Sequence, residues 1–120
     1  MTEIITAPTF NARIYIAGDY NIAKQICRGY VMKGLCVNIS KVDYIYTGGE
    51  EAGICVELIN YPVFQKNFLS ILEEAEHLAH ELMISLYQKS YTIVTSQKTY
   101  YYSRYQDIKE KNKTEERVTK

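Results

Sequence analysis

The chain has 120 residues, of which 47% are hydrophobic and 23% charged, and its basic and acidic side chains are equal in number, 14 each. This length supports one domain with a single core and excludes an enzyme with separate substrate and cofactor domains. The even charge balance lacks the basic excess that binding along a long nucleic acid requires. We therefore expect one ligand-binding domain over residues 1–105, followed by a charged tail over 106–120.

The environment of the chain can be inferred from its apolar runs and its cysteines. No apolar run approaches the roughly 20 residues that span a bilayer, and the N-terminal MTEIITAP lacks the pattern of a secretory signal. Cys27, Cys36 and Cys55 are odd in number and have no CxxC spacing, which argues against a disulfide scaffold or a zinc site. We expect a cytoplasmic protein with reduced cysteines, no cofactor, no bound metal and no membrane partner.

The first half of the chain predicts a strand, a helix and a hairpin. Residues 11–18 alternate apolar and polar side chains and lead into Asp19, a suitable helix N-cap. Apolar positions then recur at helical spacing over residues 20–33, until a glycine stops them. Residues 35–47 and 53–61 are rich in β-branched and aromatic side chains and flank two glycines, as antiparallel strands joined by a turn would.

The second half predicts a long helix and a terminal hairpin. Pro62 ends the preceding strand, and residues 65–88 then carry apolar side chains at i, i+3 and i+4 spacing. Residues 90–96 and 98–104 have the composition of two short strands with a tight turn between them. The resulting order β-α-β-β-α-β-β predicts an α+β fold with two helices on a mostly antiparallel sheet.

The stretch YTGGEEAG, residues 46–53, allows three interpretations. Diguanylate cyclases carry a GGDEF or GGEEF turn that binds a nucleotide and magnesium, but here Ala52 replaces the phenylalanine and the chain is too short for that domain. The glycines could instead permit positive φ in a hairpin that leaves Glu50 and Glu51 in solvent. A third interpretation makes the segment part of the framework of another ligand site. We favour the hairpin over the cyclase.

Motifs that would support catalysis are weak. His77 and His80 are three apart on one helix face, yet a metal site would need a third ligand that the sequence does not indicate. No serine stands in a GxSxG turn, and no histidine is patterned with a cysteine as in a nucleophile pair. We therefore predict that the protein has no catalytic residues and is not an enzyme.

Tyrosine and arginine supply the candidate ligand-binding side chains. The chain has 12 tyrosines and no tryptophan, and a cluster of them surrounds Arg104. Tyrosine can stack on a base or a protein partner and can hydrogen-bond through its hydroxyl, although a half-buried strand also favours aromatic residues. Arginine is scarce, and Arg28 lies in an apolar part of the first predicted helix. That position suits either an ordinary ion pair or a bidentate phosphate contact.

The run RIYIAGDYNIAKQICRGYVMKGLCVNISKVDYIYTGGEEAGICVELINYP, residues 13–62, resembles the phage Thoeris anti-defence proteins, which act as sponges for a TIR-derived glycocyclic ADP-ribose signal. The later pieces LAHELM, SYTIVT and TYYYSR are similar to the end of that family. The resemblance implies binding of a cyclic ADP-ribose-type nucleotide without cleavage, which would block host TIR-based antiphage defence. It also implies a homo-oligomer, up to a hexamer, with separate sites for cyclic oligonucleotides.

The same resemblance assigns residues to the ligand. It implies that Arg28 and Arg104 face the phosphates, and that Tyr100, Tyr102 and Ser103 of the terminal hairpin pack around the base or ribose. Within the family, YTGGEEAG looks like a framework hairpin beside the oligomer contact rather than a metal site. The alternative functions are a tyrosine-rich protein–protein interaction module and a binder of cyclic oligonucleotides.

Overall fold

The computed structural model describes residues 3–104, and the predicted tail over 106–120 lies outside them. The elements follow the predicted order β-α-β-β-α-β-β, with short 3-10 turns after the first helix and after the third strand. Their bounds are β1 Asn11–Ala17, α1 Tyr20–Tyr30, η1 Val31–Lys33, β2 Asn38–Tyr46, β3 Gly49–Ile59, η2 Pro62–Phe64, α2 Phe68–Ser85, β4 Ser90–Thr95 and β5 Thr99–Ser103.

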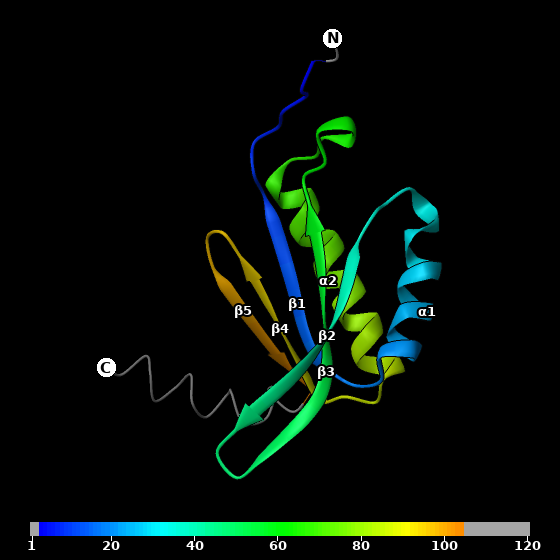
Figure 1. Cartoon of the computed structure of the whole chain (residues 1–120), viewed down its shortest axis with the longest axis vertical. Coiled ribbons are helices and arrows are strands. Elements are labelled where there is room, and N and C mark those ends of the chain that lie inside the picture. Colours follow the sequence, from blue (N-terminus) through cyan, green and yellow to red (C-terminus); the bar gives the residue numbers. More distant parts are fainter. Residues whose placement is uncertain (1–2, 105–120) are drawn as a thin grey trace, which may run out of the picture.

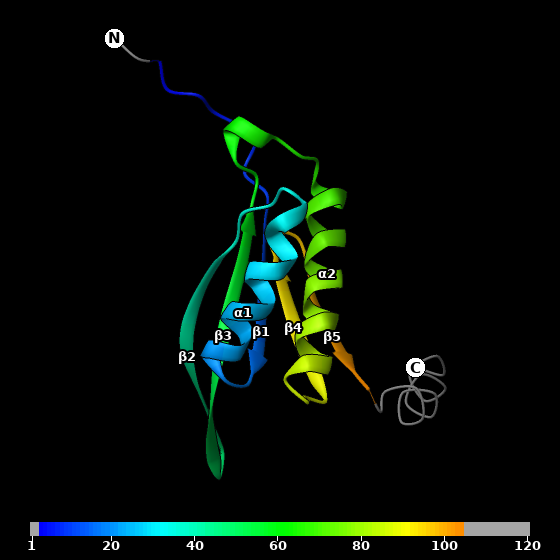
Figure 2. The ribbon, with the colours of Figure 1, turned by 90° about the vertical axis from the view of Figure 1, so that its right-hand side faces the viewer.

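The five strands form one antiparallel sheet in the order β2-β3-β1-β4-β5. The central strand β1 pairs with β3 on one side and with β4 on the other. Both helices lie on the same face of this sheet (Figures 1 and 2). The first four strands and the two helices follow the βαββαβ order of ferredoxin-like folds, to which β5 adds an edge strand. The predicted α+β fold is confirmed.

Side-chain caps set where both helices begin. The carboxylate of Asp19 accepts a hydrogen bond of 2.9 Å from a backbone amide in the first turn of α1, as predicted for an N-cap. The Asn67 side chain accepts one of 2.8 Å at the start of α2. Because this asparagine has an extended backbone, α2 begins at Phe68 rather than at residue 65, and it ends at Ser85 rather than at 88.

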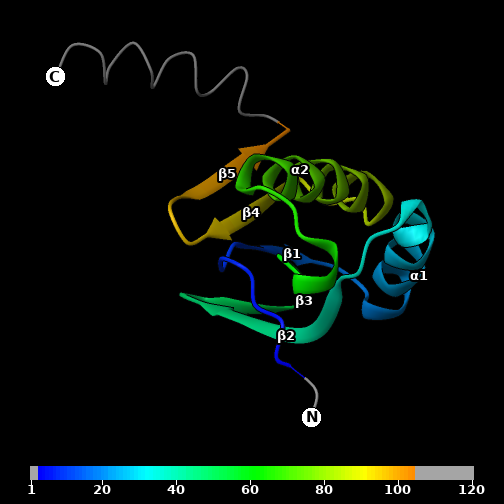
Figure 3. The ribbon, with the colours of Figure 1, turned by 90° about the horizontal axis from the view of Figure 1, so that it is seen from above.

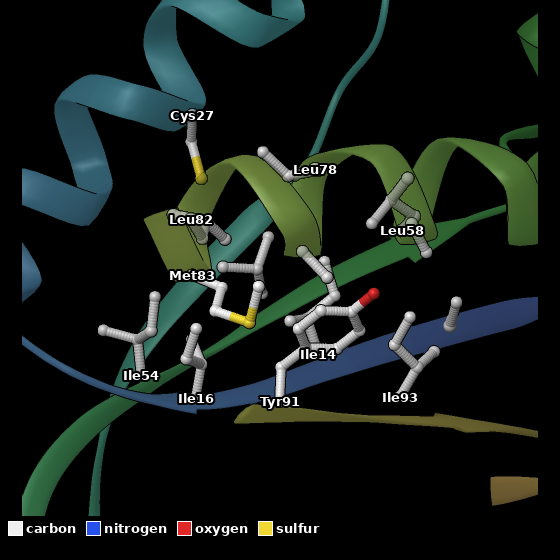
Figure 4. Packing of buried hydrophobic residues seen from close by; sticks show 14 of the residues in the cluster. Ile14, Ile16, Cys27, Ile54, Leu58, Leu78, Leu82, Met83, Tyr91 and Ile93 are labelled. Carbon is white, nitrogen blue, oxygen red and sulfur yellow. The ribbon is translucent and has the colours of Figure 1, made fainter. Parts of the chain in front are cut away.

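The hydrophobic core fills the space between the sheet and α2 (Figure 4). Ile14 of the central strand is fully buried and pairs with Val56 on one side and with Ile93 on the other. Leu78 and Leu82 of α2 cover this row and are also fully buried. Burial of each such side chain stabilises the fold by about 1.5–3 kcal/mol. The apolar stripe predicted along α2 therefore faces the core.

Within residues 3–104, no helix covers the other face of the sheet (Figure 3). Because side chains alternate along a strand, this open face receives the residues between the core positions, among them Tyr15, Tyr44 and Glu57. These side chains are partly exposed. The open face is therefore the part of the fold where polar and aromatic groups of several strands come together.

Two further features of residues 3–104 concern membrane-spanning helices and metal-binding groups. Neither helix of residues 3–104 has the length and apolar content needed to cross a membrane. The same part of the chain brings together no group of three side chains that could hold a metal ion. His80 packs edge-on against Tyr91 and Tyr102, with ring centroids 6.4 and 5.5 Å away. This histidine therefore belongs to an aromatic contact between α2 and the last hairpin.

Candidate functional site

Strands β1 and β4 separate at one end of the sheet. Their ladder runs from the pair Ala12–Thr95 to the pair Tyr15–Thr92, although β1 continues to Ala17 and β4 already begins at Ser90. The separation leaves a hollow of about 200 Å³, which we call the notch. Its lining includes Tyr15, Tyr44, Glu51, Gln88, Ser90 and Thr92.

The phenol of Tyr44 forms one wall of the notch and is held in place. Its hydroxyl donates a hydrogen bond of 2.5 Å to the carbonyl oxygen of Ile54, and its ring lies against Gly53. A Cβ atom at Gly53 would stand 2.3 Å from Cε2 of Tyr44 and 2.6 Å from the backbone oxygen of Ile16. Burial raises the pKa of Tyr44 to about 12, so the hydroxyl stays protonated at neutral pH.

Tyr15 and Glu51 add an aromatic ring and a carboxylate to this wall. The ring of Tyr15 meets that of Tyr44 edge-on, with a centroid separation of 6.5 Å. Glu51 stands opposite Tyr44 in the β2–β3 ladder and is exposed. No lysine or arginine is among the residues that line the notch. Aromatic faces and carboxylates both attract cations, so the notch suits a positively charged ligand.

The side of the notch near β4 carries neutral polar groups. Gln88 donates a hydrogen bond of 3.2 Å from its side-chain amide to the carbonyl oxygen of Leu86, which orients the amide. Ser90 and Thr92 contribute hydroxyls, which can both donate and accept hydrogen bonds. A few polar groups beside aromatic walls are typical of sites that bind a small molecule.

An ion pair continues the polar row along the open face, outside the notch. Glu57 accepts hydrogen bonds of 3.1 Å from Arg13 and 3.2 Å from Asn11, and a third of 3.4 Å from Asn38. Partial burial raises the pKa of Glu57, but the hydrogen bonds from these three side chains outweigh it and the pKa lies below its ordinary value. Arg13 is thereby engaged with a carboxylate of its own chain.

The two arginines predicted to face phosphates lie at different edges of the sheet. Arg28 is exposed on α1 and, with Lys24 one turn before it, borders a shallow groove of about 270 Å³ between α1 and β2. Arg104 follows β5, at the opposite edge of the sheet, and donates a hydrogen bond of 3.2 Å to the carbonyl oxygen of Met83. One copy of the described chain therefore does not bring these two side chains into one site.

The other predicted contact residues lie on both faces of β5. Tyr102 stacks on Tyr91 with a centroid distance of 5.5 Å, and Tyr100 packs against the margin of the core. Ser103 pairs with Ser90, which lines the notch, so Ser103 lies beside this site on the open face. A ligand role for these residues, and for the two arginines, stays a prediction.

Sequence reasoning missed Tyr15, Tyr44 and Glu51 as members of one site. A signal for two of them was present, because a two-residue turn pairs Tyr46 with Gly49 and so places Tyr44 opposite Glu51. Tyr15 joins these two residues because β1 pairs with β3, and no local pattern in the sequence indicates that pairing. Of the three interpretations of YTGGEEAG, the structure supports a hairpin that also contributes Glu51 to the lining of a candidate ligand site, while Gly53 packs against the ring of Tyr44.

Among known proteins, two solved structures share the fold of this chain. No family model matches the chain, and no curated protein does. A phage SAM lyase in its apo state matches with a TM-score of 0.69 and 16% identity, over 86% of this chain and 95% of that chain. A phage SAM lyase in complex with S-methyl-5'-thioadenosine matches with a TM-score of 0.60 and 14% identity, over the same shares of both chains. Identities this low establish likeness of fold.

These structures correct the prediction that the protein is not an enzyme. Both are of a lyase, so the fold is one that supports catalysis. The lack of nucleophile and metal motifs in the sequence does not argue against catalysis, because an enzyme can also act by orienting a substrate that carries its own leaving group.

The resemblance to phage proteins holds at the level of the fold. Both matching structures are phage proteins, and one of them binds a small nucleoside. Neither is a Thoeris protein, and the expected cyclic ADP-ribose ligand and homo-oligomer stay predictions.

Proposed function

We propose that this chain binds S-adenosylmethionine (SAM) in the notch and cleaves it to S-methyl-5'-thioadenosine. The observation that carries the proposal is the charge of the notch, where Glu51 lies beside the tyrosine wall and no basic side chain is among the lining residues. SAM has a sulfonium and an ammonium group, so it matches this charge. The thioadenosine bound to the matching fold is the part of SAM that remains when the bond between sulfur and Cγ breaks.

The two cationic groups and the nucleoside of SAM would each have a partner in the notch. The sulfonium would lie against the rings of Tyr15 and Tyr44, where cation–π attraction stabilises it. Glu51 would hold the α-ammonium, whose charge does not change during the reaction. Ser90 and Thr92 would hydrogen-bond to the nucleoside. This arrangement folds the amino-acid part of SAM back towards its own Cγ atom.

The reaction that fits this arrangement is an intramolecular displacement. An oxygen of the substrate's α-carboxylate attacks Cγ, a C–O bond forms, and the Cγ–S bond breaks with its electron pair passing to sulfur. The products are a neutral thioether nucleoside and a five-membered lactone, with no water or proton consumed. Because a negative oxygen and a positive sulfur neutralise each other, weakly hydrated aromatic surroundings favour the transition state over solvated SAM. The protein contributes orientation and exclusion of water.

The test is incubation of the purified protein with SAM in H2¹⁸O, followed by mass spectrometry of the products. We expect equal amounts of S-methyl-5'-thioadenosine and unlabelled homoserine lactone. Loss of one charge-assisted hydrogen bond costs roughly 1.5–3 kcal/mol, so Glu51→Gln should lower kcat/KM by about 10–100-fold. Glu50→Gln, at the preceding residue of the same strand, is the matched control. Intact SAM after long incubation with wild type would overturn the proposal.

Binding of the cyclic ADP-ribose-type signal is a second candidate, favoured by the groove beside α1. Lys24 and Arg28 place two cations at this groove, as a ligand with two phosphates requires. Such binding would sequester the TIR-derived signal and so block the host defence. Calorimetric titration with glycocyclic ADP-ribose should show at least about tenfold weaker binding for Arg28→Ala. Equal affinities for wild type and Arg28→Ala would remove the groove as the site.

Self-association is the remaining part of the proposed function. The open face exposes Tyr46 and Tyr101, with 53% and 60% of their surface accessible, and exposed aromatic side chains are common where protein chains associate. We expect copies of the chain to pack through this face into a homo-oligomer, up to the hexamer that the resemblance implies. Light scattering at micromolar concentration measures this directly, and a monomer would contradict it.

A further inference from the structure

A second cavity lies at the other end of β3 from the notch. Its volume is about 280 Å³, and it is bounded by the segment before β2, the end of β3, η2 and the first turns of α2. The walls are mainly apolar and include Leu35, Leu58, Phe64 and Ile71. We call it the η2 cavity. The polar side chains among its lining residues are Cys36, Tyr61, Lys66 and Glu74.

The acidic side chain of the η2 cavity is already neutralised by its neighbours. Oε1 of Glu74 accepts a hydrogen bond of 2.6 Å from the hydroxyl of Tyr30 and contacts Nζ of Lys33 at 3.3 Å. The hydrogen bond from Tyr30, with support from Lys33, lowers the pKa of this carboxyl. Glu74 is therefore ionised and paired, and it leaves little negative charge for a ligand to meet.

The basic side chain of the cavity has no such partner. The backbone amide of Lys66 donates a hydrogen bond of 2.7 Å to the side chain of Asn60, which is buried and fixes this part of the chain. Within residues 3–104, the ion pairs involve Arg13 and Lys33, and none involves Lys66. The unpaired charge at the cavity is therefore positive.

A neutral donor stands on the same cavity wall. The hydroxyl of Tyr61 and Sγ of Cys36 lie 3.3 Å apart and share a hydrogen bond, and because a thiol is a weaker acceptor than a carboxylate, the hydroxyl can turn to an anionic ligand. The hydrogen bond with Cys36 and partial burial raise the pKa of Tyr61 to about 12. The phenol therefore keeps its proton at neutral pH and can donate a hydrogen bond to an anion.

We infer that the η2 cavity binds a small apolar carboxylate. The hydrocarbon or aryl body would pack against Leu58 and Ile71, and the carboxylate would accept hydrogen bonds from Lys66 and Tyr61. Burial of the apolar body supplies affinity, and the unpaired ammonium selects the sign of the charge. The inference does not depend on SAM cleavage, because the η2 cavity shares no lining residue with the notch.

The probe for this site is 3-phenylpropionate, measured by calorimetry and by saturation-transfer NMR on the full chain. Phenethylamine has a phenyl ring on a similar short chain and carries the opposite charge, so it serves as the matched ligand. We expect saturable binding of 3-phenylpropionate that is at least about tenfold tighter than that of phenethylamine. Lys66→Met keeps an apolar stem without the charge and should weaken 3-phenylpropionate about tenfold. Lys98→Met, in the turn before β5, should leave the affinity unchanged.

Three results would overturn the inference. One is equal affinity of the two probes for wild type, since the charge of the cavity would then select nothing. Another is unaltered 3-phenylpropionate binding in both Lys66→Met and Tyr61→Phe. The third is displacement of the probe by S-methyl-5'-thioadenosine, which would place the nucleoside in this cavity. Glu51→Gln should leave probe binding intact, and Lys66→Met should leave SAM cleavage intact, so the two proposals fail separately.

Discussion

The two faces of the sheet are built from the same strands but differ in kind. On the face under the helices, Ile14 and Val56 are fully buried, and the fully buried side chains of residues 3–104 are hydrophobic. On the open face, their chain neighbours Tyr15 and Glu57 are partly exposed and hydrogen-bonded or in ring contact. The difference shows that one face supplies most of the folding free energy, which leaves the other free to carry polar groups that bind a ligand.

The largest effect is expected on the covered face, from Leu78→Asp. Leu78 is fully buried, so the substitution would place an unpaired carboxylate in the core at a cost of several kcal/mol. We expect an unfolded or aggregated protein by circular dichroism. Leu69→Asp is the control on the same helix, because Leu69 is 68% exposed and should tolerate the change. A soluble and fully folded Leu78→Asp variant would contradict the orientation of α2.

A smaller effect is expected on the open face, from Gly53→Ala. The new Cβ would stand 2.3 Å from the ring of Tyr44 and 2.6 Å from the oxygen of Ile16, so ring and backbone must move. We expect a loss of about 1–3 kcal/mol in urea unfolding, together with loss of SAM cleavage. Gly29→Ala is the control, because nothing lies within 4 Å of its Cβ position in α1. That variant should gain about 0.5–1 kcal/mol, and equal stabilities of the two variants would refute the close approach.

The contact of α1 with α2, on the covered face, is expected to give a smaller effect. The hydroxyl of Tyr30 donates to the Glu74 carboxylate at 2.6 Å, so Tyr30→Phe removes a hydrogen bond to a charged group. We expect a loss of about 1 kcal/mol, since the pair is only partly buried. Tyr87→Phe, at a position 90% exposed, should change stability little. In a double-mutant cycle with Glu74→Gln, a zero coupling energy would show that the contact contributes nothing.

The smallest effect on stability is expected from protonation, at acid pH, of Glu57 in its ion pair with Arg13 on the open face. The pKa of Glu57 lies below its ordinary value of 4.5, so its hydrogen bonds stabilise the protein above that pH. This contribution is lost as the pH falls through the lowered pKa. Because Arg13 is 48% exposed, the effect should stay below about 1 kcal/mol. Unfolding midpoints of wild type and Glu57→Gln should converge as the pH falls through the lowered pKa of Glu57, and a constant difference would exclude Glu57 as the titrating group.

The elements of this fold could be predicted because their signals are local. The apolar stripe through Leu78, the Asp19 cap and Pro62 each act within a few residues, and all three appear where the sequence indicated. The ends of α2 were misplaced, because the Asn67 cap decides them and the periodicity does not. The strand order followed from none of these signals, since long-range pairing brings β1 between β3 and β4.

The candidate site was harder to predict from the sequence, because it too depends on long-range pairing of strands. Tyr44 and Glu51 share one hairpin, so their proximity follows from its turn. Tyr15 and Gln88 join them only because β1 and β4 separate, which no local pattern encodes. Arg104 had the chemistry of a phosphate ligand, yet in the fold it donates to the carbonyl oxygen of Met83 at the end of α2. Residue type alone could not reveal that partner.

The central place of β1 has a consequence for how the protein is made. Ala12, in the first strand of this domain, pairs with Leu58 and with Thr95, so the middle of the sheet cannot close until nearly the whole domain has been translated. Such long-range pairing slows folding. A nascent or truncated chain that lacks β4 would present an unpaired edge of β1, and such an edge can template aggregation. Shortened forms that end before β4 should therefore collect as insoluble material rather than as smaller folded proteins.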